Sequence, residues 1–355
     1  MKRQGDGRRK IVIRADASAR IGLGHLRRCA TLGKLLSGKG VAVHFLTRCE
    51  DIDPAREVGG FAQACVPLDP KLDPEADAVA TVEYCRSTGA DRLVVDHYRV
   101  DEAYQLALRD AGIRWLQFDG AANMPMWADW VVSMSPAADE ARYASLRRGA
   151  RTHLLLGPRF AILRDEFLRH QARRPVPDRA TRLLMTFGGG DDRGAFLACL
   201  SALPEDGRFQ VTLLSGGHNP QLPAIRHWMD RNPLARVQLL LDDDQIARRM
   251  AEADIAVTAG GTTTFETAML GLPALVVQIA DNQAANAGAW QRAGIALDLG
   301  PLEQLDPLLL RARLVDLSAD SRLRQRMADL GRACVDGRGA ERIADELYPD
   351  GERVQ

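Results

Sequence analysis

Two periodic patterns of apolar and polar residues alternate along the chain and predict its secondary structure. Short apolar runs recur between longer stretches in which apolar residues return every three or four positions. The short runs predict buried strands and the longer stretches predict amphipathic helices, an alternation that indicates βαβ units around a parallel sheet. In the first half, the predicted strands are 11–13, 41–46, 93–95 and 115–118, and the predicted helices are 25–38, 75–87 and 102–110.

A polar segment with two prolines interrupts this pattern at 171–179 and is typical of an interdomain linker. The alternation then restarts, so we predict two consecutive α/β halves of similar size. In the second half, the predicted strands are 183–187, 210–214, 237–241, 255–258 and 274–277, and the predicted helices are 194–202, 243–253, 263–270, 284–293 and a helical tail at 308–347. The expected organisation is an N-terminal domain at 1–170, the linker, a C-terminal domain at 180–335, and a final helix and tail at 336–355.

The composition narrows the class of protein. The chain has 355 residues, of which 46% are apolar and 26% charged, and this suits a folded protein of two domains. Its 47 Lys and Arg residues balance 47 Asp and Glu residues, so no basic surface for nucleic acid is expected over the whole chain. The six cysteines form no C-x-x-C pair, so neither a disulfide framework nor a zinc site is expected. The histidines outside the motifs below show no ligand spacing and predict no metal: His44, His153, His170, His218 and His227.

The lengths of the apolar runs also indicate whether the protein spans a membrane or is secreted. No stretch reaches the roughly 18 apolar residues of a membrane-spanning helix. The basic start of the chain, from Lys2 to Lys10, is interpreted as a solvated tail, because only the short run at 11–13 follows it and no secretory signal is recognisable. We therefore expect a cytoplasmic protein with reduced thiols, no cofactor and no membrane span.

The turn after the first strand carries the first candidate site. Residues 21–25 read Ile-Gly-Leu-Gly-His and open the first predicted helix, where glycines permit close approach of a ligand and free N–H groups attract polarised oxygens. His25 is the candidate catalytic base, because the amino end of a helix disfavours the imidazolium. Gly24 is expected to contact substrate, and Asp16 either to orient His25 or to contact ligand hydroxyls. The alternative is an ordinary turn with a surface histidine.

A second motif, Asp-His-Tyr at 96–98, follows the strand at 93–95 and should reach the same edge of the first sheet. Tyr98 offers a hydroxyl group and a flat ring for a sugar, so it is a candidate substrate contact. Asp96 either belongs to the site or caps the following turn.

Three glycines at 188–190 follow the first strand of the second half. Consecutive glycines expose backbone N–H groups, which suits a diphosphate or a substrate lying across them. A purely structural turn needs fewer glycines. Gly188 and Gly189 are therefore candidate substrate contacts.

The most informative motif follows the strand at 255–258. A small, hydroxyl-rich loop leads directly into a short helix, and the N–H groups at that helix start can hold a diphosphate, where the helix dipole favours negative charge. Glu266 lies one turn into the helix, where it can accept hydrogen bonds from ribose hydroxyls. No Walker lysine is present, which argues against an NTPase. The candidate diphosphate-binding residues are Gly260, Gly261, Thr262 and Thr263.

Asn282 and Gln283 follow the strand at 274–277. Their side-chain amides offer both donors and acceptors, as sugar recognition requires. A helix cap at this point is the alternative interpretation, and it is compatible with sugar binding.

Taken in order, these motifs resemble one family over nearly the whole chain, from about residue 11 to 340. They are IGLGH at 21–25, DHY at 96–98, LGPRFAILR at 156–164, FGG at 187–189, AGGTTTFE at 259–266 and ADNQ at 280–283. The chain resembles the UDP-2,4-diacetamido-2,4,6-trideoxy-β-L-altropyranose hydrolases of pseudaminic acid biosynthesis. The second half also looks like the UDP-binding half of the N-acetylglucosaminyltransferase that makes lipid II, a GT-B protein.

The resemblance implies a GT-B fold, in which two Rossmann-like domains with parallel sheets face an interdomain cleft. It implies metal-independent hydrolysis of a UDP-sugar to free sugar and UDP, with His25 activating water for attack at the anomeric carbon with inversion. Tyr98 and Asn282 match positions that line the sugar site, and Glu266 matches the ribose contact. The product would pass to pathway enzymes that build a nonulosonic acid for flagellin or surface polysaccharide.

Two segments depart from the family pattern. Members commonly carry two aspartates where this chain has Asp119 and Gly120, and a Gln-Asn stretch where it has Ser-Met-Ser at 133–135. These departures bear on the sugar more than on the reaction class. An inverting glycosyltransferase that uses a similar UDP-sugar is the alternative function, and a non-catalytic nucleotide-sugar sensor is a third. Hydrolysis is favoured because the first half shows no apolar amphipathic patch for a lipid acceptor.

Overall fold

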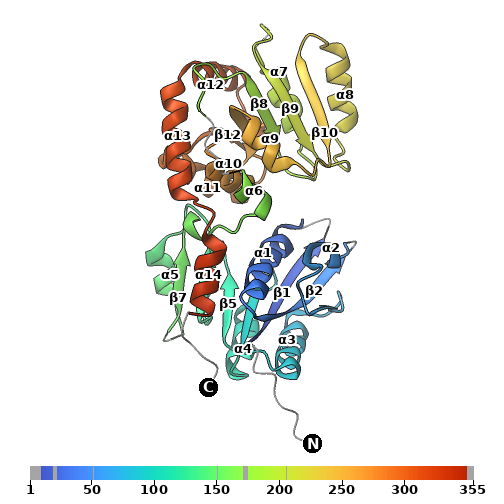
Figure 1. The fold of residues 1–355 in the computed structure, drawn as a ribbon, viewed down its shortest axis with the longest axis vertical. Helices are drawn as coiled ribbons and strands as arrows, with labels where there is room; N and C mark the ends of the chain where they lie inside the picture. The colour runs from blue at the N-terminus through green and yellow to red at the C-terminus, as the bar shows by residue number, and fades with distance from the viewer. Residues whose placement is uncertain are drawn as a thin grey trace, which may run out of the picture. The chain divides into compact units, whose positions relative to one another are not determined.

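The computed structural model describes residues 9–18, 22–50, 52–149, 151–170, 175–204 and 206–349. The chain divides into two compact units, which are residues 1–164 with 337–355 (unit 1) and residues 165–336 (unit 2). Each unit is built on one parallel sheet with helices on both faces (Figure 1). Ile21 of the first motif and the first four residues of the expected linker, 171–174, lie outside the described residues.

Unit 1 has a seven-stranded sheet in the order β3-β2-β1-β4-β5-β6-β7. Its strands are β1 (Lys10–Ser18), β2 (Ala42–Glu50), β3 (Ala64–Pro67), β4 (Arg92–Asp96), β5 (Trp115–Phe118), β6 (Trp130–Ser133) and β7 (His153–Leu156). Its helices are α1 (Gly24–Gly38), α2 (Ala55–Val58), α3 (Pro74–Thr88), α4 (Glu102–Asp110), α5 (Glu140–Leu146), η1 (Pro158–Phe160) and α14 (Gly339–Leu347).

The central strand β1 shows why this sheet lies inside unit 1. Its residues are buried along almost the whole strand, because both faces are covered, as is usual for parallel sheets. Ile11 and Ile13 point to a core shared with α1 and α14, while Val12 points to a core shared with α3 and α4.

Unit 2 has a six-stranded sheet in the order β10-β9-β8-β11-β12-β13. Its strands are β8 (Arg182–Thr186), β9 (Gln210–Ser215), β10 (Arg236–Leu241), β11 (Ile255–Ala259), β12 (Ala274–Gln278) and β13 (Ala296–Pro301). Its helices are α6 (Asp165–Arg169), α7 (Ala195–Ser201), α8 (Leu222–Arg231), α9 (Ile246–Glu252), α10 (Thr263–Leu270), η2 (Asp281–Gln283), α11 (Ala284–Arg292), η3 (Leu302–Gln304), α12 (Pro307–Ala319) and α13 (Ser321–Cys334).

The boundaries of the two units differ from the expected ones at two places. The final helix α14, expected as a separate tail at 336–355, belongs to unit 1, where it packs against α1. Its amphipathic face buries Ile343, Ala344 and Leu347 in the core of that unit. Helix α6, expected in the N-terminal domain, belongs to unit 2 and contacts α9 and α10.

The strand orders place one topological switch point in each sheet. In unit 1, β2 and β3 follow on one side of β1, while β4 and the later strands follow on its other side. In unit 2, β9 and β10 lie on one side of β8, while β11, β12 and β13 lie on its other side. Connections after such a strand pair leave toward opposite faces and open a crevice at the carboxyl edge, where α/β proteins bind ligands. The first, second, third and fourth sequence motifs follow β1, β4, β8 and β11 in turn, so all four lie at a switch point.

Candidate functional site

His25 lies at the switch point of unit 1, as the second residue of α1. Gly22, with φ of +77°, makes the turn before the helix, a backbone conformation that glycine adopts without strain. Leu23, which precedes α1, makes no capping hydrogen bond through its side chain, so in the described part of the chain the first N–H groups of the helix remain available. Gly24, the first residue of α1, is exposed, whereas His25 is only 9% exposed.

The imidazole of His25 is held by Asp96, the last residue of β4. The distance from His25 Nδ1 to Asp96 Oδ1 is 2.6 Å. The two residues come together because β1 and β4 are neighbours, with Ala15 paired to Asp96 in register. A neutral imidazole that donates from Nδ1 keeps its lone pair on Nε2, so the pair has the arrangement of an oriented general base. The alternative that Asp96 caps the next turn is not observed in the described residues, where its carboxylate accepts hydrogen bonds from the side chains of His25, Arg28 and Cys29.

Asp96 is itself buried, and its carboxylate accepts several hydrogen bonds. Arg28 donates to both carboxylate oxygens, from Nε to Oδ2 and from Nη2 to Oδ1, each at 2.5 Å. Cys29 Sγ also donates to Oδ2 at 3.4 Å, and burial raises the pKa of this thiol well above its usual range. Burial alone would raise the pKa of the Asp96 carboxyl, but Arg28 and His25 hold it well below its usual range. The carboxylate therefore stays ionised beside the imidazole.

Tyr98 stands beside His25 and faces solvent. Its ring meets the imidazole edge to face, with centroids 4.5 Å apart and planes at 85°. The side chain is 71% exposed, which is unusual for a tyrosine and leaves its ring and hydroxyl free to meet a ligand. The structure thus brings together His25, Asp96 and Tyr98 from two motifs of the sequence.

Asp16 belongs to a different network. It accepts a hydrogen bond from Arg14 Nη1, and Arg14 also donates to Asp77 from Nε at 3.0 Å and from Nη2 at 2.6 Å. Arg14 and Asp77 are fully buried, and Asp16 is nearly so. Of the two roles expected for Asp16, orienting His25 falls instead to Asp96. Contact with ligand hydroxyls remains a prediction.

In unit 2, the turn between β11 and α10 leaves several backbone donors unused. Thr262 precedes α10, and its side chain makes no capping hydrogen bond. The N–H groups of Thr264 and Phe265 bond within the turn, to the carbonyls of Gly261 and Thr262. Over the part of the chain that the structure describes, the N–H groups of Gly261, Thr262 and Thr263 have no acceptor. Such an uncapped helix start is suited to an anion.

Gln283 connects this turn to the loop after β12. Its Oε1 accepts hydrogen bonds from Gly260 N at 3.1 Å and from Ile279 N at 3.0 Å. The Gly260 N–H, expected to face a diphosphate, therefore donates to Gln283 instead. The side-chain carbonyl of Gln283, expected to meet the sugar, accepts from two backbone N–H groups. Asn282, in η2, is exposed, and Glu266 lies half-buried in the first turn of α10.

The glycine loop after β8 lies at the same switch point. Gly188, with φ of +96°, and Gly189 are exposed. The loop is held by Asp192, which accepts hydrogen bonds from Asn219 Nδ2 and from Phe196 N, both at 2.8 Å. Exposed glycines let a ligand approach the backbone closely, and contact of Gly188 and Gly189 with substrate remains a prediction.

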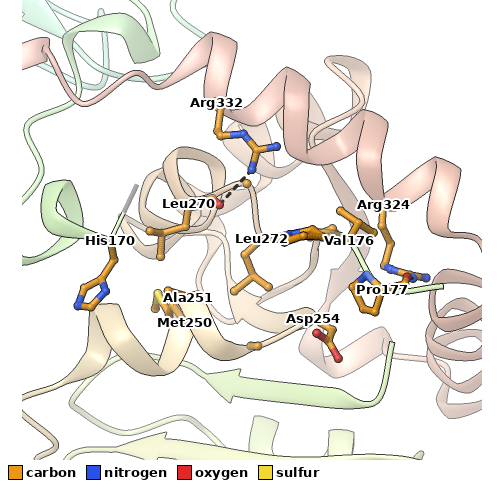
Figure 2. Close-up of a pocket in the computed structure, with 14 residues that line it drawn as sticks. His170, Val176, Pro177, Met250, Ala251, Asp254, Leu270, Leu272, Arg324 and Arg332 are labelled. Carbon is orange, nitrogen blue, oxygen red and sulfur yellow. Dashed lines mark hydrogen bonds between the residues drawn. The ribbon is translucent and has the colours of Figure 1, made fainter. Parts of the chain in front are cut away.

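A small cavity of about 50 Å³ lies elsewhere in unit 2, at the amino ends of β11 and β12 (Figure 2). Asp254 and Pro273, which precede these strands, line it together with Arg324 and Arg332 of α13. Arg324 donates to the carbonyl of Pro177, which ties the segment after α6 to α13. Because ligands of parallel sheets bind at the opposite, carboxyl edge, we assign this cavity to packing.

Neither a metal site nor a membrane span is found in the described ranges. No group of three or more His, Cys, Asp or Glu side chains there is arranged to hold a metal ion. No helix in the same ranges combines the length and the apolar content that crossing a membrane requires.

Comparison with known proteins finds a family model that matches part of the chain and relatives that match more of it. Residues 190–334, within unit 2, match the family model of the glycosyltransferase family 28 C-terminal domain. Spore coat polysaccharide biosynthesis protein SpsG of Bacillus subtilis is 26% identical over 203 residues, which cover 56% of this chain and 59% of SpsG. The chain therefore spans about three-fifths of the length of that relative.

A second relative and a solved structure extend over more of the chain. The UDP-2,4-diacetamido-2,4,6-trideoxy-beta-L-altropyranose hydrolase of Campylobacter jejuni is 20% identical over 272 residues, covering 74% of this chain and 88% of the hydrolase. MurG of Acinetobacter baumannii has a crystal structure with a TM-score of 0.66 and 18% identity, covering 95% of this chain and 99% of MurG. Together with the two parallel-sheet units, this likeness shows that the chain has the GT-B α/β fold, as predicted.

Proposed function

We propose that the protein is a metal-independent hydrolase that cleaves a UDP-linked diacetamido-trideoxy hexose to the free sugar and UDP, within nonulosonic (pseudaminic) acid biosynthesis. The family model matched by unit 2 and the similarity to the Campylobacter jejuni hydrolase support a UDP-sugar as substrate. The observation that carries the reaction type is the buried His25, bonded through Nδ1 to an ionised Asp96 and flanked by the exposed Tyr98.

This geometry supports the following proton transfers. His25 Nε2 takes a proton from water while the water oxygen attacks the anomeric carbon of the sugar. The bond from that carbon to the diphosphate oxygen breaks, and its electron pair leaves with UDP. The Asp96 carboxylate stabilises the imidazolium that forms, and attack opposite the leaving group inverts the anomeric configuration. A positioned base of this kind contributes about 100- to 10,000-fold in rate.

Unit 2 supplies the electrostatic part of this reaction. Negative charge accumulates on the diphosphate as the bond breaks, and donors aimed at that charge lower the barrier. This role is assigned to the positive end of α10 and to the N–H groups of Gly261, Thr262 and Thr263, which have no acceptor among the described residues. Glu266 is assigned to the ribose hydroxyls, and Asn282, with Gly188 and Gly189, to the sugar.

The decisive assay omits any acceptor. Purified protein is incubated with a UDP-2,4-diacetamido-2,4,6-trideoxy hexose and a chelator, and the products are followed by phosphorus and proton NMR. We expect stoichiometric UDP and free sugar, with the first-formed anomer inverted relative to the substrate. A change of the sugar without release of UDP, or binding without any reaction, would contradict hydrolysis.

His25→Ala tests the base. We expect turnover to fall by about 100- to 10,000-fold, because the water loses its proton acceptor, while the dissociation constant for UDP stays within about twofold. His153→Ala is the matched control, since His153 is an exposed histidine at the amino end of β7, at the opposite edge of the same sheet. Near-native turnover in the His25 variant would remove the base assignment.

A glycosyltransferase is the second candidate function, and the matched family model favours it. A transferase needs the same nucleotide-binding residues and a base that activates an acceptor hydroxyl in place of water. The same assay separates the two functions, because a transferase releases UDP only when an acceptor is added.

A further inference from the structure

Arg28 is a charged residue that the proposed reaction does not use, yet it contacts both members of the His25–Asp96 pair. It lies three residues after His25 on α1, so both side chains lie on one face of the helix. Its Nη2 is 2.5 Å from Asp96 Oδ1 and 3.0 Å from His25 Nδ1, while its Nε is 2.5 Å from Asp96 Oδ2. The side chain is 20% exposed.

The two hydrogen bonds from Arg28 fix the plane of the Asp96 carboxylate. A planar guanidinium that engages both carboxylate oxygens sets their orientation, which a single contact cannot do. The guanidinium is itself held, because its carbon lies 4.8 Å from the centre of the Phe118 ring on β5. Asp96 Oδ1 is thereby kept 2.6 Å from His25 Nδ1.

The same contacts decide which imidazole nitrogen carries the proton. Nδ1 faces a carboxylate oxygen at 2.6 Å and a guanidinium nitrogen at 3.0 Å. With a proton on Nδ1, the ring donates to the ionised Asp96; without one, it accepts from Arg28 and loses the shorter bond. Because the contact with the ionised carboxylate is the shorter of the two, the arrangement favours a proton on Nδ1.

We propose that Arg28 is a positioning residue, which holds Asp96 so that His25 donates from Nδ1 and keeps Nε2 unprotonated for the water. This role rests on the proposed function of His25 as the base. Arg28 thereby orients the imidazole through its bonds to Asp96 and its contact with His25 Nδ1, on the side of the ring away from Nε2.

Kinetics of two Arg28 variants test the role. Arg28→Gln removes the charge and the paired geometry, so we expect kcat for UDP release to fall about 10- to 100-fold, as for other partners that orient a functional histidine. KM and the dissociation constant for UDP should stay within about twofold, since unit 2 is assigned the nucleotide. Arg28→Lys keeps the charge without the two-pronged contact, so we expect it to restore only part of kcat.

The neighbouring Arg27→Gln is the matched control. Arg27 lies on the same helix and pairs with Glu57 at 3.1 Å, away from Asp96. We expect wild-type kcat in this variant. Equal losses in the Arg27 and Arg28 variants, or a wild-type kcat in Arg28→Gln, would overturn the proposal.

The tautomer of His25 gives a readout that does not depend on turnover. Nitrogen-15 chemical shifts of His25, assigned by comparison with a His25→Asn variant, should show the proton on Nδ1 in the wild type and a mixture of tautomers in Arg28→Gln. An unchanged tautomer in Arg28→Gln would refute the positioning role even if activity fell. If instead neither the wild type nor any variant hydrolyses the UDP-sugar while the tautomer shifts as expected, the proposed function fails, and the part of the inference that remains is that Arg28 sets the tautomer of His25.

Discussion

Acidification should destabilise unit 1 through His97, a buried histidine next to the candidate site that the proposed reaction does not use. His97 is 6% exposed, and its ring packs against Tyr104 with centroids 5.2 Å apart. Its Nδ1 accepts a hydrogen bond from Arg99 N at 3.3 Å, and its Nε2 has no hydrogen-bond partner over the described residues. A proton added to this ring would therefore be placed in a buried site that already contains Arg14.

The magnitude follows from the pKa of His97. Burial, together with the charge of Arg14, lowers this pKa to about 4, and the three nearby carboxylates of Asp16, Asp77 and Asp96 oppose the shift only in part. The unfolded chain binds the proton near the ordinary pKa of about 6.5, so the unfolded state gains protons first as the pH falls. The free energy of unfolding should then decrease by about 2 kcal/mol between pH 8 and pH 5, and by about 3 kcal/mol at pH 4.

The assay compares the wild type with His97→Asn by urea unfolding between pH 8 and pH 4. Asn keeps an acceptor near the position of Nδ1 and does not titrate, so the variant should lose the part of the acid sensitivity that His97 causes. Its stability at pH 8 is expected to be lower by a constant amount because the smaller side chain leaves space against Tyr104. His153→Asn, at an exposed histidine of the same unit, should retain the acid sensitivity of the wild type.

A particular result would refute this reasoning. If the difference in unfolding free energy between the wild type and His97→Asn were the same at pH 8 and at pH 5, His97 would not titrate between those values. The buried environment assigned to it would then be incorrect.

Two further predictions concern binding and stability. Glu266→Ala should weaken UDP binding by about 1–3 kcal/mol, measured by calorimetry, as for a lost hydrogen bond to a charged group, and an unchanged dissociation constant would exclude the ribose role. Asp77→Asn should lower the free energy of unfolding by about 1–3 kcal/mol, because it removes one of the two carboxylates, Asp77 and Asp16, that pair with the fully buried Arg14. Asp345→Asn, in an exposed ion pair, should cost less than about 1 kcal/mol, and equal losses would contradict the burial argument.

The amino-acid pattern was sufficient for most central elements of both sheets. The predicted strand at 115–118 and the predicted helices at 102–110 and 263–270 have the observed bounds. Buried strands and amphipathic helices are visible in a sequence because a residue's burial in them repeats with the period of the local backbone.

The elements that the pattern missed lie mostly at the sides of the sheets. Strands β3, β6, β7 and β13, together with helices α2, α5, α6 and α8, were not predicted. Three of these strands have only four residues, too few for a periodic signal to stand out. Their partners across the sheet, rather than their own sequence, decide that they are strands.

The sequence alone determined which residues follow the strands, and therefore the candidates His25, Tyr98, Glu266 and the glycine loops. Only the tertiary structure decided that Asp96, rather than Asp16, holds His25, and that Arg28 holds Asp96 in turn. His25 and Asp96 are 71 positions apart, and they meet because β4 pairs with β1. Strand order depends on contacts between distant segments, whereas sequence patterns report only the local backbone, so no local pattern could have revealed this pair.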